Sequence, residues 1–328
     1  IDRIEPIQNA VKVYSEFNQK KRPISCLFKY SSNIEKIFKP KIIHPNNKSS
    51  VPSSALVGVG GFSNEIIIPN LLKLKNYNSL DYLCVKKPIS FLNSSSFYKN
   101  INVVNDYNSL LKDKLLDVVF ISTRHNSHWE LTKKALQNQK HVFCEKPICI
   151  SIKELKEIKS FFTKQKKTPI LVTGFNRRFS ESAKILKEFI EKSEEPILLN
   201  YTVNADKLLP NSWVYSDEGG GRNIGEACHF YDLILYIIND KFINIQVNSI
   251  NSNYKNQKKT DNFFVSIKFR NGSTANLNYS SAGTVNKIKE IIEIRNSNET
   301  IIMENFQRII LIENNIKKII YSSKFPEK

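Results

Sequence analysis

The sequence predicts an α/β fold: a doubly wound parallel sheet followed by an α+β domain with a large, mainly antiparallel open sheet. Residues 54–174 alternate between short apolar runs, typical of buried parallel strands, and amphipathic segments of helical period. Residues 242–321 instead carry one strand pattern after another, with no helical pattern between them. The length of 328 residues is enough for two domains with substantial cores.

Composition and charge narrow the class of protein. Hydrophobic residues make up 41% and charged residues 24% of the chain, and no apolar run is long enough to predict a membrane span. The net charge of +18 raises nucleic-acid binding as a hypothesis, but the excess is mainly lysine spread along the chain, whereas phosphate and base recognition favours arginine. We expect neither a nucleic-acid nor a membrane partner. Five scattered cysteines, an odd number, favour a reducing, cytoplasmic location.

The first 53 residues predict only isolated elements. Residues 6–20 have apolar residues at helical spacing, and residues 24–30 form one predicted strand. Residues 31–53 are polar and contain three prolines, which is typical of a linker. Because one helix and one strand have no partners of their own, we expect residues 1–30 to be the tail of a preceding domain. The lack of an initiator methionine or signal-peptide pattern favours the same interpretation.

The stretch from Ser54 to Pro69 carries the first functional signal. An apolar run meets three glycines, and a helical pattern begins after them. Glycines permit a sharp turn and the close approach of a ligand, and a helix N-terminus attracts phosphate. A dinucleotide-binding unit of the Rossmann type is therefore predicted, with an ordinary strand–helix turn as the alternative. Serine takes the third glycine position of G-x-G-x-x-G. The expected cofactor contacts here are Gly58, Gly60, Gly61, Phe62 and Ser63.

A second strand, predicted at residues 80–85, ends in Lys86 and Lys87. The dinucleotide fold usually has an acidic residue at this point, where it binds the ribose hydroxyls. Two cations in its place favour the 2′-phosphate of NADP, although simple solvation of both lysines is an equal alternative. The cofactor is therefore expected to be NAD or NADP, with Lys86 as a candidate contact.

The remaining elements of the first domain alternate regularly. The predicted strands are 101–104, 117–123, 141–144 and 170–173. The predicted helices are 65–75, 107–111, 128–139 and 151–166. In a doubly wound sheet the carboxyl ends of the strands meet at one ligand-binding crevice. The polar residues that follow these strand ends, and that we expect at the crevice, are Thr123, Arg124, His125, His128, Glu145, Lys146, Asn176, Arg177 and Arg178. The first six of them are expected to contact the cofactor.

The second domain opens with a predicted helix at 181–192 and a strand at 197–203. A loop with Trp213 then leads to three glycines and an apolar helix that carries His229. The strands predicted after this helix are 242–250, 261–270, 273–281, 287–296, 299–303 and 306–312. The dipeptide Asn271-Gly272 predicts a hairpin turn between two of them.

Three motifs now carry a resemblance to a known family. They are the glycine turn GVGGFSN, the tripeptide EKP at 145–147, and GGGRNIGEACHFYD at 219–232. From residue 54 to about 312 the chain resembles the glucose-fructose oxidoreductase / inositol dehydrogenase / MocA (Gfo/Idh/MocA) family. The forms TRHNSHW, GFNRRF and GGGRNIGEACHF resemble the branch fused behind a zinc-type, medium-chain dehydrogenase domain. Residues 6–30 resemble the closing helix and strand of that upstream domain.

The resemblance implies an NAD(P)-dependent dehydrogenase that acts on sugars, cyclitols or sugar nucleotides. It also implies a homo-oligomer formed through the open sheet of the second domain. The family uses the EKP lysine and a later histidine as acid/base residues, and these match Lys146 and His229. It usually has an aspartate four residues before that histidine, where this chain has Gly225, and Glu226 is the candidate replacement. The implied division is a remnant at 1–30, a linker at 31–53, an NAD(P)-binding domain at 54–175 and a substrate and dimerisation domain at 176–328.

The residues themselves suit that chemistry. Hydride removal from a carbinol carbon needs a base for the hydroxyl proton and a positive group that polarises the oxygen. Lys146 at a strand end suits the second role, and His229 behind a glycine loop suits the first. Each residue also has a purely structural alternative. Lys146 could be a structural lysine at a strand end, and His229 could be a core histidine hydrogen-bonded to Asp232. For Glu226 the alternative is a structural ion pair.

The substrate contacts are predicted with their alternatives open. Arg177 and Arg178 either hold an acidic group of the substrate or pair with acidic side chains. Trp213 either stacks on a sugar ring or belongs to the core, and Asn176 and Asp232 complete the candidate set. Two histidines and a cysteine lack the spacing of a full metal site, so no metal is expected. The competing function is a non-catalytic nucleotide-binding regulator, or a subunit that depends on a missing partner domain.

Overall fold

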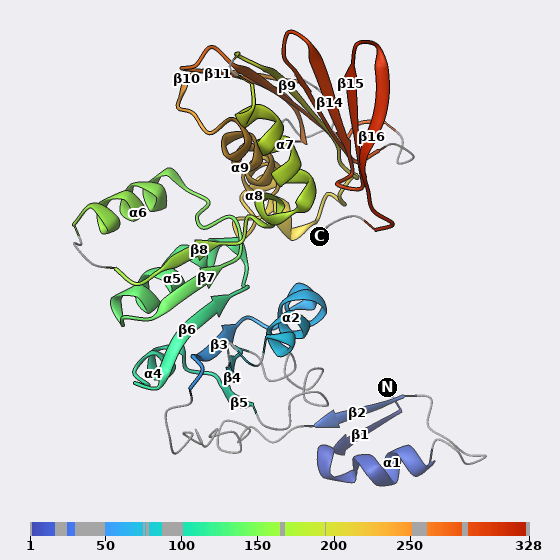
Figure 1. Ribbon diagram of the computed structural model, residues 1–328. Coiled ribbons are helices and arrows are strands. Elements are labelled where there is room, and N and C mark those ends of the chain that lie inside the picture. Colours follow the sequence, from blue (N-terminus) through green and yellow to red (C-terminus); the bar gives the residue numbers. More distant parts are fainter. Residues whose placement is uncertain are drawn as a thin grey trace.

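The computed structural model describes most of the chain. The described residues are 2–16, 25–29, 50–74, 76, 79–86, 101–164, 168–193, 195–250, 261–283 and 288–325. Figure 1 shows a small N-terminal unit, a first sheet with its helices, and a second, larger sheet with helices between it and the first. The linker expected at 31–53 is described only from residue 50 onwards, and Lys87 lies outside the described residues.

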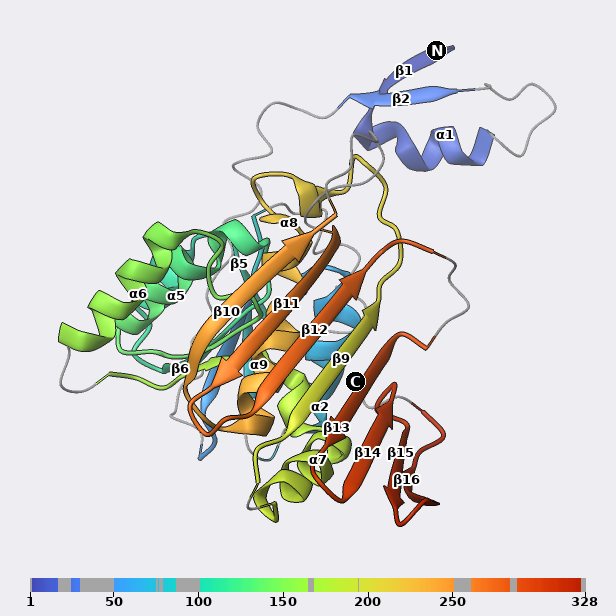
Figure 2. The same ribbon diagram turned by 90° about the horizontal axis from the view of Figure 1, so that it is seen from above.

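The N-terminal unit pairs two short strands in parallel. It comprises β1 (Arg3–Pro6), the 3-10 turn η1 (Ile7–Asn9), α1 (Ala10–Glu16) and β2 (Cys26–Lys29). The predicted helix and the predicted strand are both present, and β1 is an additional strand that the sequence pattern did not reveal. Tyr14 of α1 stacks on Phe28 of β2, with 6.0 Å between ring centroids. Figures 1 and 2 show this unit set off from the two large sheets.

The first large sheet has six parallel strands in the order β5-β4-β3-β6-β7-β8. Its strands are β3 (Ser53–Val57), β4 (Ser79–Cys84), β5 (Asn102–Val104), β6 (Leu116–Ile121), β7 (His141–Cys144) and β8 (Leu171–Thr173). The chain winds outward from β3 in one direction and from β6 in the other. The doubly wound prediction is confirmed, and β3 and β6 flank the switch point at which such sheets bind ligands.

Helices cover both faces of this sheet because its strands are apolar on both sides. They are η3 (Ser63–Ile67, a π-helical turn), α2 (Ile68–Lys73), α4 (Tyr107–Leu111), η4 (His125–Ser127), α5 (His128–Gln137) and α6 (Ile152–Lys164). Leu56 and Leu83 pack with Ile68 of α2 on one face. On the other face, Ala55 and Val119 belong to the cluster that includes α4 and α5. No helix in the described part of the chain is long and apolar enough to cross a membrane.

The second domain is built on an eight-stranded sheet in the order β10-β11-β12-β9-β13-β14-β15-β16. The strands are β9 (Leu198–Asn204), β10 (Phe242–Ser249), β11 (Asn262–Phe269), β12 (Thr274–Ser280), β13 (Glu290–Arg295), β14 (Glu299–Glu304), β15 (Arg308–Glu313) and β16 (Ile316–Ser322). All neighbouring strands are antiparallel except β12 and β9. The mainly antiparallel sheet is therefore confirmed, and β16 is one strand more than predicted.

Five further elements connect this sheet to the first domain. They are η5 (Asn176–Phe179), α7 (Glu181–Glu191), η6 (Trp213–Tyr215), α8 (Gly221–Gly225) and α9 (Cys228–Ile238). Phe230 and Leu233 of α9 pack with Leu199 and Leu277 of the sheet in one buried cluster. Figure 1 shows α7, α8 and α9 between the second sheet and the first domain, and Figure 2 shows the opposite face of the sheet open. The short helix α8 and the start of α9 thereby meet the carboxyl ends of the parallel strands.

Candidate functional site

The turn after β3 forms a cradle with open space beside two glycines. Gly58 has a φ of +87°, and a Cβ on it would lie 2.6 Å from the carbonyl oxygen of Ser122, so only glycine fits there. A Cβ on Gly60 or Gly61 would meet no atom within 4 Å. The backbone is helical from Gly61 onwards, so the unpaired N–H groups of a helix start lie at this open turn.

Ser63 stands where G-x-G-x-x-G would have its third glycine. Its side chain is fully buried, and its hydroxyl donates a hydrogen bond of 2.7 Å to the carbonyl oxygen of Gly58. The bond ties the first helical turn to the end of β3. Serine therefore keeps the close helix–strand packing that the third glycine usually permits.

Lys146 and His229 come together where β7 meets the helices of the second domain. Lys146 follows the end of β7, and its ammonium donates a hydrogen bond of 3.0 Å to the carbonyl oxygen of Gly225. Gly225 is the last residue of α8, and His229 lies four residues later in the first turn of α9. Lys146 of the first domain thus binds the segment just before α9, and its charge acts on His229, 83 residues later in the sequence.

Burial shifts the pKa values of both groups. Burial lowers the pKa of Lys146 below its usual range. Burial, together with the charges of Lys146, Arg177 and Lys289, lowers the pKa of His229 to about 2. The imidazole is therefore neutral, and its Nδ1 atom has no hydrogen-bond partner among the residues that the structure describes. A neutral imidazole beside an ammonium has the composition of a site that removes a proton from a hydroxyl group.

Glu226 is hydrogen-bonded to other side chains of the second domain. Its carboxylate accepts hydrogen bonds from Arg222 at 2.8 and 3.0 Å and from the hydroxyl of Tyr279 at 2.7 Å. Burial would raise the pKa of this carboxyl, but Arg222 and the Tyr279 hydroxyl outweigh that effect and the pKa is lowered. These contacts agree with the structural ion pair that the sequence left open, and a catalytic role for Glu226 stays a prediction.

Arg177 and Arg178 both form two-pronged ion pairs with carboxylates. Arg177 donates to Glu290 at 2.5 and 3.0 Å, and Arg178 donates to Asp232 at 2.5 and 2.6 Å. The alternative in which His229 bonds to Asp232 is therefore not observed. Asn176, which precedes the two arginines, is exposed. The substrate contacts predicted for this group stay predictions.

His128 joins the ends of β6 and β7. Its Nδ1 atom lies 2.8 Å from the carbonyl oxygen of Pro147, and its Nε2 atom lies 3.0 Å from that of Thr123. The hydroxyl of Thr123 shares a hydrogen bond of 2.6 Å with that of Ser127. Both ring nitrogens thus face the backbone of the crevice, so His128 supports its shape. Within the described residues, no group of three or more potential ligands is placed to hold a metal ion.

The turn after β6 also contacts the glycine segment of the second domain. The Arg124 guanidinium lies 4.0 Å from the centroid of the Trp213 ring and 3.8 Å from the carboxylate of Glu218. The Nδ1 atom of His125 lies 2.8 Å from the carbonyl oxygen of Gly219, and its ring meets Trp213 edge-on at 4.8 Å. Trp213 packs against two side chains of the first domain, and its predicted contact with a sugar ring stays untested.

Glu145 follows β7 and Lys86 lies beyond β4, two strands that β3 and β6 separate in the first sheet. A Cβ on Gly174 would lie 2.9 Å from the Glu145 carboxylate, so this acid packs against the glycine that follows β8. Burial raises the pKa of Glu145 to about 7, against the opposing effect of Lys146. Lys86 is exposed two residues beyond the end of β4. Both positions are compatible with cofactor contacts, which stay predictions.

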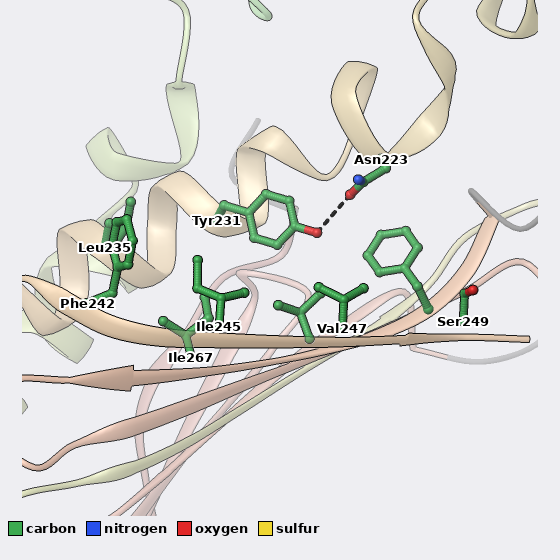
Figure 3. A pocket seen from close by; sticks show the side chains of 10 residues that line it. Asn223, Tyr231, Leu235, Phe242, Ile245, Val247, Ser249 and Ile267 are labelled. Atoms are coloured by element: carbon green, nitrogen blue, oxygen red, sulfur yellow. Dashed lines mark hydrogen bonds between the residues drawn. The ribbon is translucent and has the colours of Figure 1, made fainter. Parts of the chain in front are cut away.

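An apolar groove lies on the other side of α9. Its volume is about 340 Å³, and Figure 3 shows Tyr231 and Leu235 of the helix facing Ile245 and Val247 of β10 across it. On the helix side of the groove, the Tyr231 hydroxyl donates a hydrogen bond of 2.8 Å to the side chain of Asn223. Residues two apart on a helix point in nearly opposite directions, so this groove is separate from the reaction centre around His229.

Two models of one family match the chain. The model described as "Oxidoreductase family, NAD-binding Rossmann fold" matches residues 53–174. The model described as "Oxidoreductase family, C-terminal alpha/beta domain" matches residues 197–295. The two matches together cover more than half of the chain and fall on the two sheets described above. The chain belongs to the Gfo/Idh/MocA oxidoreductase family.

Known Gfo/Idh/MocA proteins resemble the chain in sequence and in fold. Myo-inositol 2-dehydrogenase of Thermotoga maritima is 32% identical over 139 residues, which are 42% of this chain and 40% of that protein. The chain spans about half, or less, of the length of the curated relatives that it matches first.

Two solved structures show the same fold at low sequence identity. Aldose-aldose oxidoreductase of Caulobacter crescentus superposes with a TM-score of 0.72 at 15% identity, covering 85% of each chain. A super-repressor mutant of Gal80p from Saccharomyces cerevisiae superposes with a TM-score of 0.69 at 15% identity, covering 84% of this chain and 80% of that one. The same fold thus occurs in a protein named as an oxidoreductase and in one named as a repressor mutant.

The cofactor of the Gfo/Idh/MocA family fits the cradle of this chain. Space beside Gly60 and Gly61, which any Cβ would narrow, admits a pyrophosphate against the backbone. The helix that begins at Gly61 offers N–H groups and the positive end of its dipole to that group. The Rossmann domain therefore binds NAD or NADP, whose nicotinamide supplies a hydride acceptor or donor when bound.

Several residues of the centre escaped the sequence-based prediction. Tyr201, Tyr279 and Glu290 hold its charged groups, and Lys289 contributes charge near His229. They lie on or beside strands of an antiparallel sheet, far from the motifs, and no local pattern marks them. Arg222 differs, because it lies inside the glycine motif at i−4 from Glu226, a spacing that indicates an ion pair.

Proposed function

We propose that this chain is an NAD(P)-dependent dehydrogenase that transfers a hydride between the nicotinamide and a CH–OH carbon of a sugar, cyclitol or sugar nucleotide. The observation that carries the proposal is the bond from the Lys146 ammonium to Gly225, one helical turn before a neutral His229 whose Nδ1 atom has no partner among the described residues. The myo-inositol 2-dehydrogenase among the relatives supports a polyhydroxylated substrate.

Lys146 polarises the substrate oxygen. Its ammonium is held by a neutral carbonyl oxygen, which leaves other N–H donors of the same group for a ligand. As the hydride leaves carbon, the C–O bond gains double-bond character, and a nearby positive charge stabilises the electron density on oxygen. Partial burial strengthens that interaction, because few water molecules screen it.

His229 receives the hydroxyl proton. Within the part of the chain that the structure describes, its Nδ1 atom has no hydrogen-bond partner, and the low pKa keeps the ring in its proton-accepting form at neutral pH. A weakly basic ring accepts this proton most readily as the hydride leaves. The departing hydride turns the alcohol into a protonated carbonyl, which is a far stronger acid than the alcohol, so a weak base then accepts its proton. In the reverse direction the same ring returns the proton to the carbonyl oxygen.

The test is a turnover assay with a matched lysine control. The wild-type protein is screened with NAD⁺ and NADP⁺ against myo-inositol, other cyclitols, aldoses and sugar nucleotides, and reduced cofactor is followed by absorbance. For the active substrate we expect Lys146→Ala to lower kcat by roughly 10²- to 10⁴-fold, the usual range for a positioned acid/base group. Lys153→Ala, on the exposed surface of α6, should leave kcat unchanged.

Cofactor binding separates loss of chemistry from loss of fold. Nicotinamide fluorescence should show that Lys146→Ala still binds the cofactor. Unchanged turnover in Lys146→Ala would contradict the mechanism, and absence of turnover with every substrate tested in the wild type would contradict the function.

A second candidate function is a nucleotide-binding regulator or subunit without chemistry of its own. Two observations favour it: glycine at position 225, where the resembling family usually has an aspartate, and the super-repressor Gal80p mutant among the structural neighbours. It predicts cofactor binding without turnover, and Lys146→Ala would then change nothing measurable.

The domain division and the assembly belong to the same proposal. We assign residues 54–175 to the cofactor and residues 176–328 to substrate and oligomer contacts. Residues 1–30 would come from an upstream domain of the zinc-type dehydrogenase kind, and 31–53 would be the linker.

The open sheet face carries Ile291, Ile302 and Ile310, whose apolar surface supports a homo-oligomer. Light scattering after gel filtration should give a multiple of the monomer mass, and a monomer would contradict that part. All five cysteines are free, which supports a reducing cytoplasm.

A further inference from the structure

Steric crowding by a neighbouring side chain, and not the backbone conformation, explains why glycine occupies position 225. Gly225 is helical and is not among the described glycines of positive φ, so its backbone does not require glycine. A Cβ on it would instead lie 2.9 Å from Cε1 and 3.2 Å from Nδ1 of His125. The imidazole of the first domain thus fills the space that a side chain at position 225 would need.

The His125 ring cannot simply turn aside. Its Nδ1 atom is bonded to the carbonyl oxygen of Gly219 at 2.8 Å, and Trp213 meets the ring edge-on at 4.8 Å. Gly219 is itself packed tightly, since a Cβ there would lie 2.4 Å from the carbonyl oxygen of Val214. One ring therefore contacts both ends of the segment from Gly219 to Gly225.

That segment determines where the Lys146 ammonium lies. The ammonium donates a hydrogen bond of 3.0 Å to the carbonyl oxygen of Gly225. Within the described residues, no carboxylate comes within ion-pair distance of Lys146: Glu226 is bound by Arg222, and Glu290 by Arg177. A lysine held by a carbonyl keeps the lowered pKa that burial produces, whereas a carboxylate in contact would raise it.

We propose that His125 is the positioning residue of this centre: its imidazole occupies the place of an acidic side chain at position 225 and, through the carbonyls of Gly219 and Gly225, sets the location of the Lys146 ammonium. The proposal deepens the proposed function and rests on it for its catalytic meaning. His125 touches neither reacting atom in this account; it acts through the glycine segment.

A double-variant cycle tests the steric half of the proposal. His125→Ala and Gly225→Ala are made singly and together, and turnover and melting temperature are measured. Each single change should lower kcat by roughly ten- to a hundred-fold, the cost of displacing a catalytic group by about 1 Å. The double variant should be no worse than the poorer single variant, because the new methyl group fits the space that the ring vacates. Losses that multiply would overturn the proposal.

The pH dependence of Lys146 tests the positioning half without any substrate. An amine-acylating reagent is applied across a pH series, and the modified Lys146 peptide is quantified by mass spectrometry. In His125→Ala, water enters beside the ammonium, and we expect the labelling midpoint to move upward by about one pH unit. His125→Asn, whose amide can still donate to Gly219, should keep the wild-type midpoint. An unmoved midpoint in His125→Ala would refute the positioning role.

His141→Ala is the matched histidine control, because this residue is exposed at the start of β7, at the opposite end of the strand from Lys146. It should leave both kcat and the labelling midpoint unchanged. If the wild type turns over no substrate, the proposed function fails, but the melting-temperature cycle and the labelling midpoints still decide the place of His125.

Discussion

The guanidinium of Arg177 donates hydrogen bonds of 2.5 and 3.0 Å to the carboxylate of Glu290, across 113 residues of sequence. The hydroxyl of Tyr201 donates a third hydrogen bond to the same carboxylate. The side chains of Arg177 and Glu290 are only 18% and 8% exposed. This network ties the segment after β8 to the start of β13, and so it fixes that segment on the second sheet beside the reaction centre.

Removing one partner of this pair should be costly. Glu290→Gln leaves a buried guanidinium without its compensating charge, and we expect the free energy of unfolding to fall by about 3–5 kcal/mol. Urea unfolding followed by circular dichroism measures it. The control is Arg308→Ala, which breaks the half-exposed pair with Glu304 and should cost less than about 1 kcal/mol. Equal losses in the two variants would show that the buried network is not special.

His229 should make stability depend on pH in a defined direction. Burial, then the charges of Lys146, Arg177 and Lys289, lowers its native pKa to about 2, against 6.5 for an unperturbed histidine. Between these values the unfolded chain binds a proton that the native protein does not, so this contribution is fully present above pH 6.5 and is lost as the pH falls. At pH 5 the loss is about 2 kcal/mol.

The variant His229→Gln should therefore flatten the unfolding free energy between pH 7 and pH 5. Unfolding in urea at a series of pH values measures the slope for the wild type and the variant. His141→Gln, at an exposed position, should keep the wild-type slope. An identical slope in His229→Gln and the wild type would mean that the buried imidazole is not neutral.

The two glycines of the cradle should respond differently to alanine. Gly60→Ala adds a methyl group to open space, so the melting temperature should hold while dinucleotide affinity falls at least about tenfold through contact with the pyrophosphate. Gly58→Ala forces a φ of +87° and a 2.6 Å contact with Ser122, so it should lower stability as well. Calorimetric titration with NAD(P)H and thermal melts measure both effects. Equal melting temperatures for the two variants would contradict this account.

Lys86 should influence the choice between NAD and NADP. It is exposed beyond the end of β4, where the dinucleotide fold usually binds the ribose of the adenosine. Lys86→Glu should weaken NADP binding and favour NAD, because a carboxylate repels the 2′-phosphate and accepts hydrogen bonds from a 2′-hydroxyl. The ratio of the two dissociation constants, measured by fluorescence, should shift by about tenfold or more, which is 1.4 kcal/mol. An unchanged ratio of the two dissociation constants would mean that Lys86 is only solvated and does not contact the cofactor.

Much of the fold was predictable from local pattern. The strands from β3 to β8 are short apolar runs between glycines and polar residues, and period alone separates them from the helices. The strands β1 and β16 escaped, because β1 is a four-residue segment and β16, with the sequence IKKIIYS, lacks regular apolar/polar alternation and lies at an exposed edge. Such segments become strands by pairing with a neighbour, and the neighbour is not visible in their own sequence.

The sequence by itself determined the class of the protein. A glycine turn after a buried strand, an EKP tripeptide at a later strand end and a histidine behind three glycines are local motifs, and local motifs state which chemistry a chain carries. Only the tertiary structure decided how the charged side chains are paired. Arg177 pairs with Glu290, Arg178 pairs with Asp232, and Glu226 is bound by Arg222 and Tyr279. It also decided that His125 and Gly225 share one space. Ion pairs and steric exclusion depend on distances between residues far apart in the chain, and those distances exist only once the two sheets have packed.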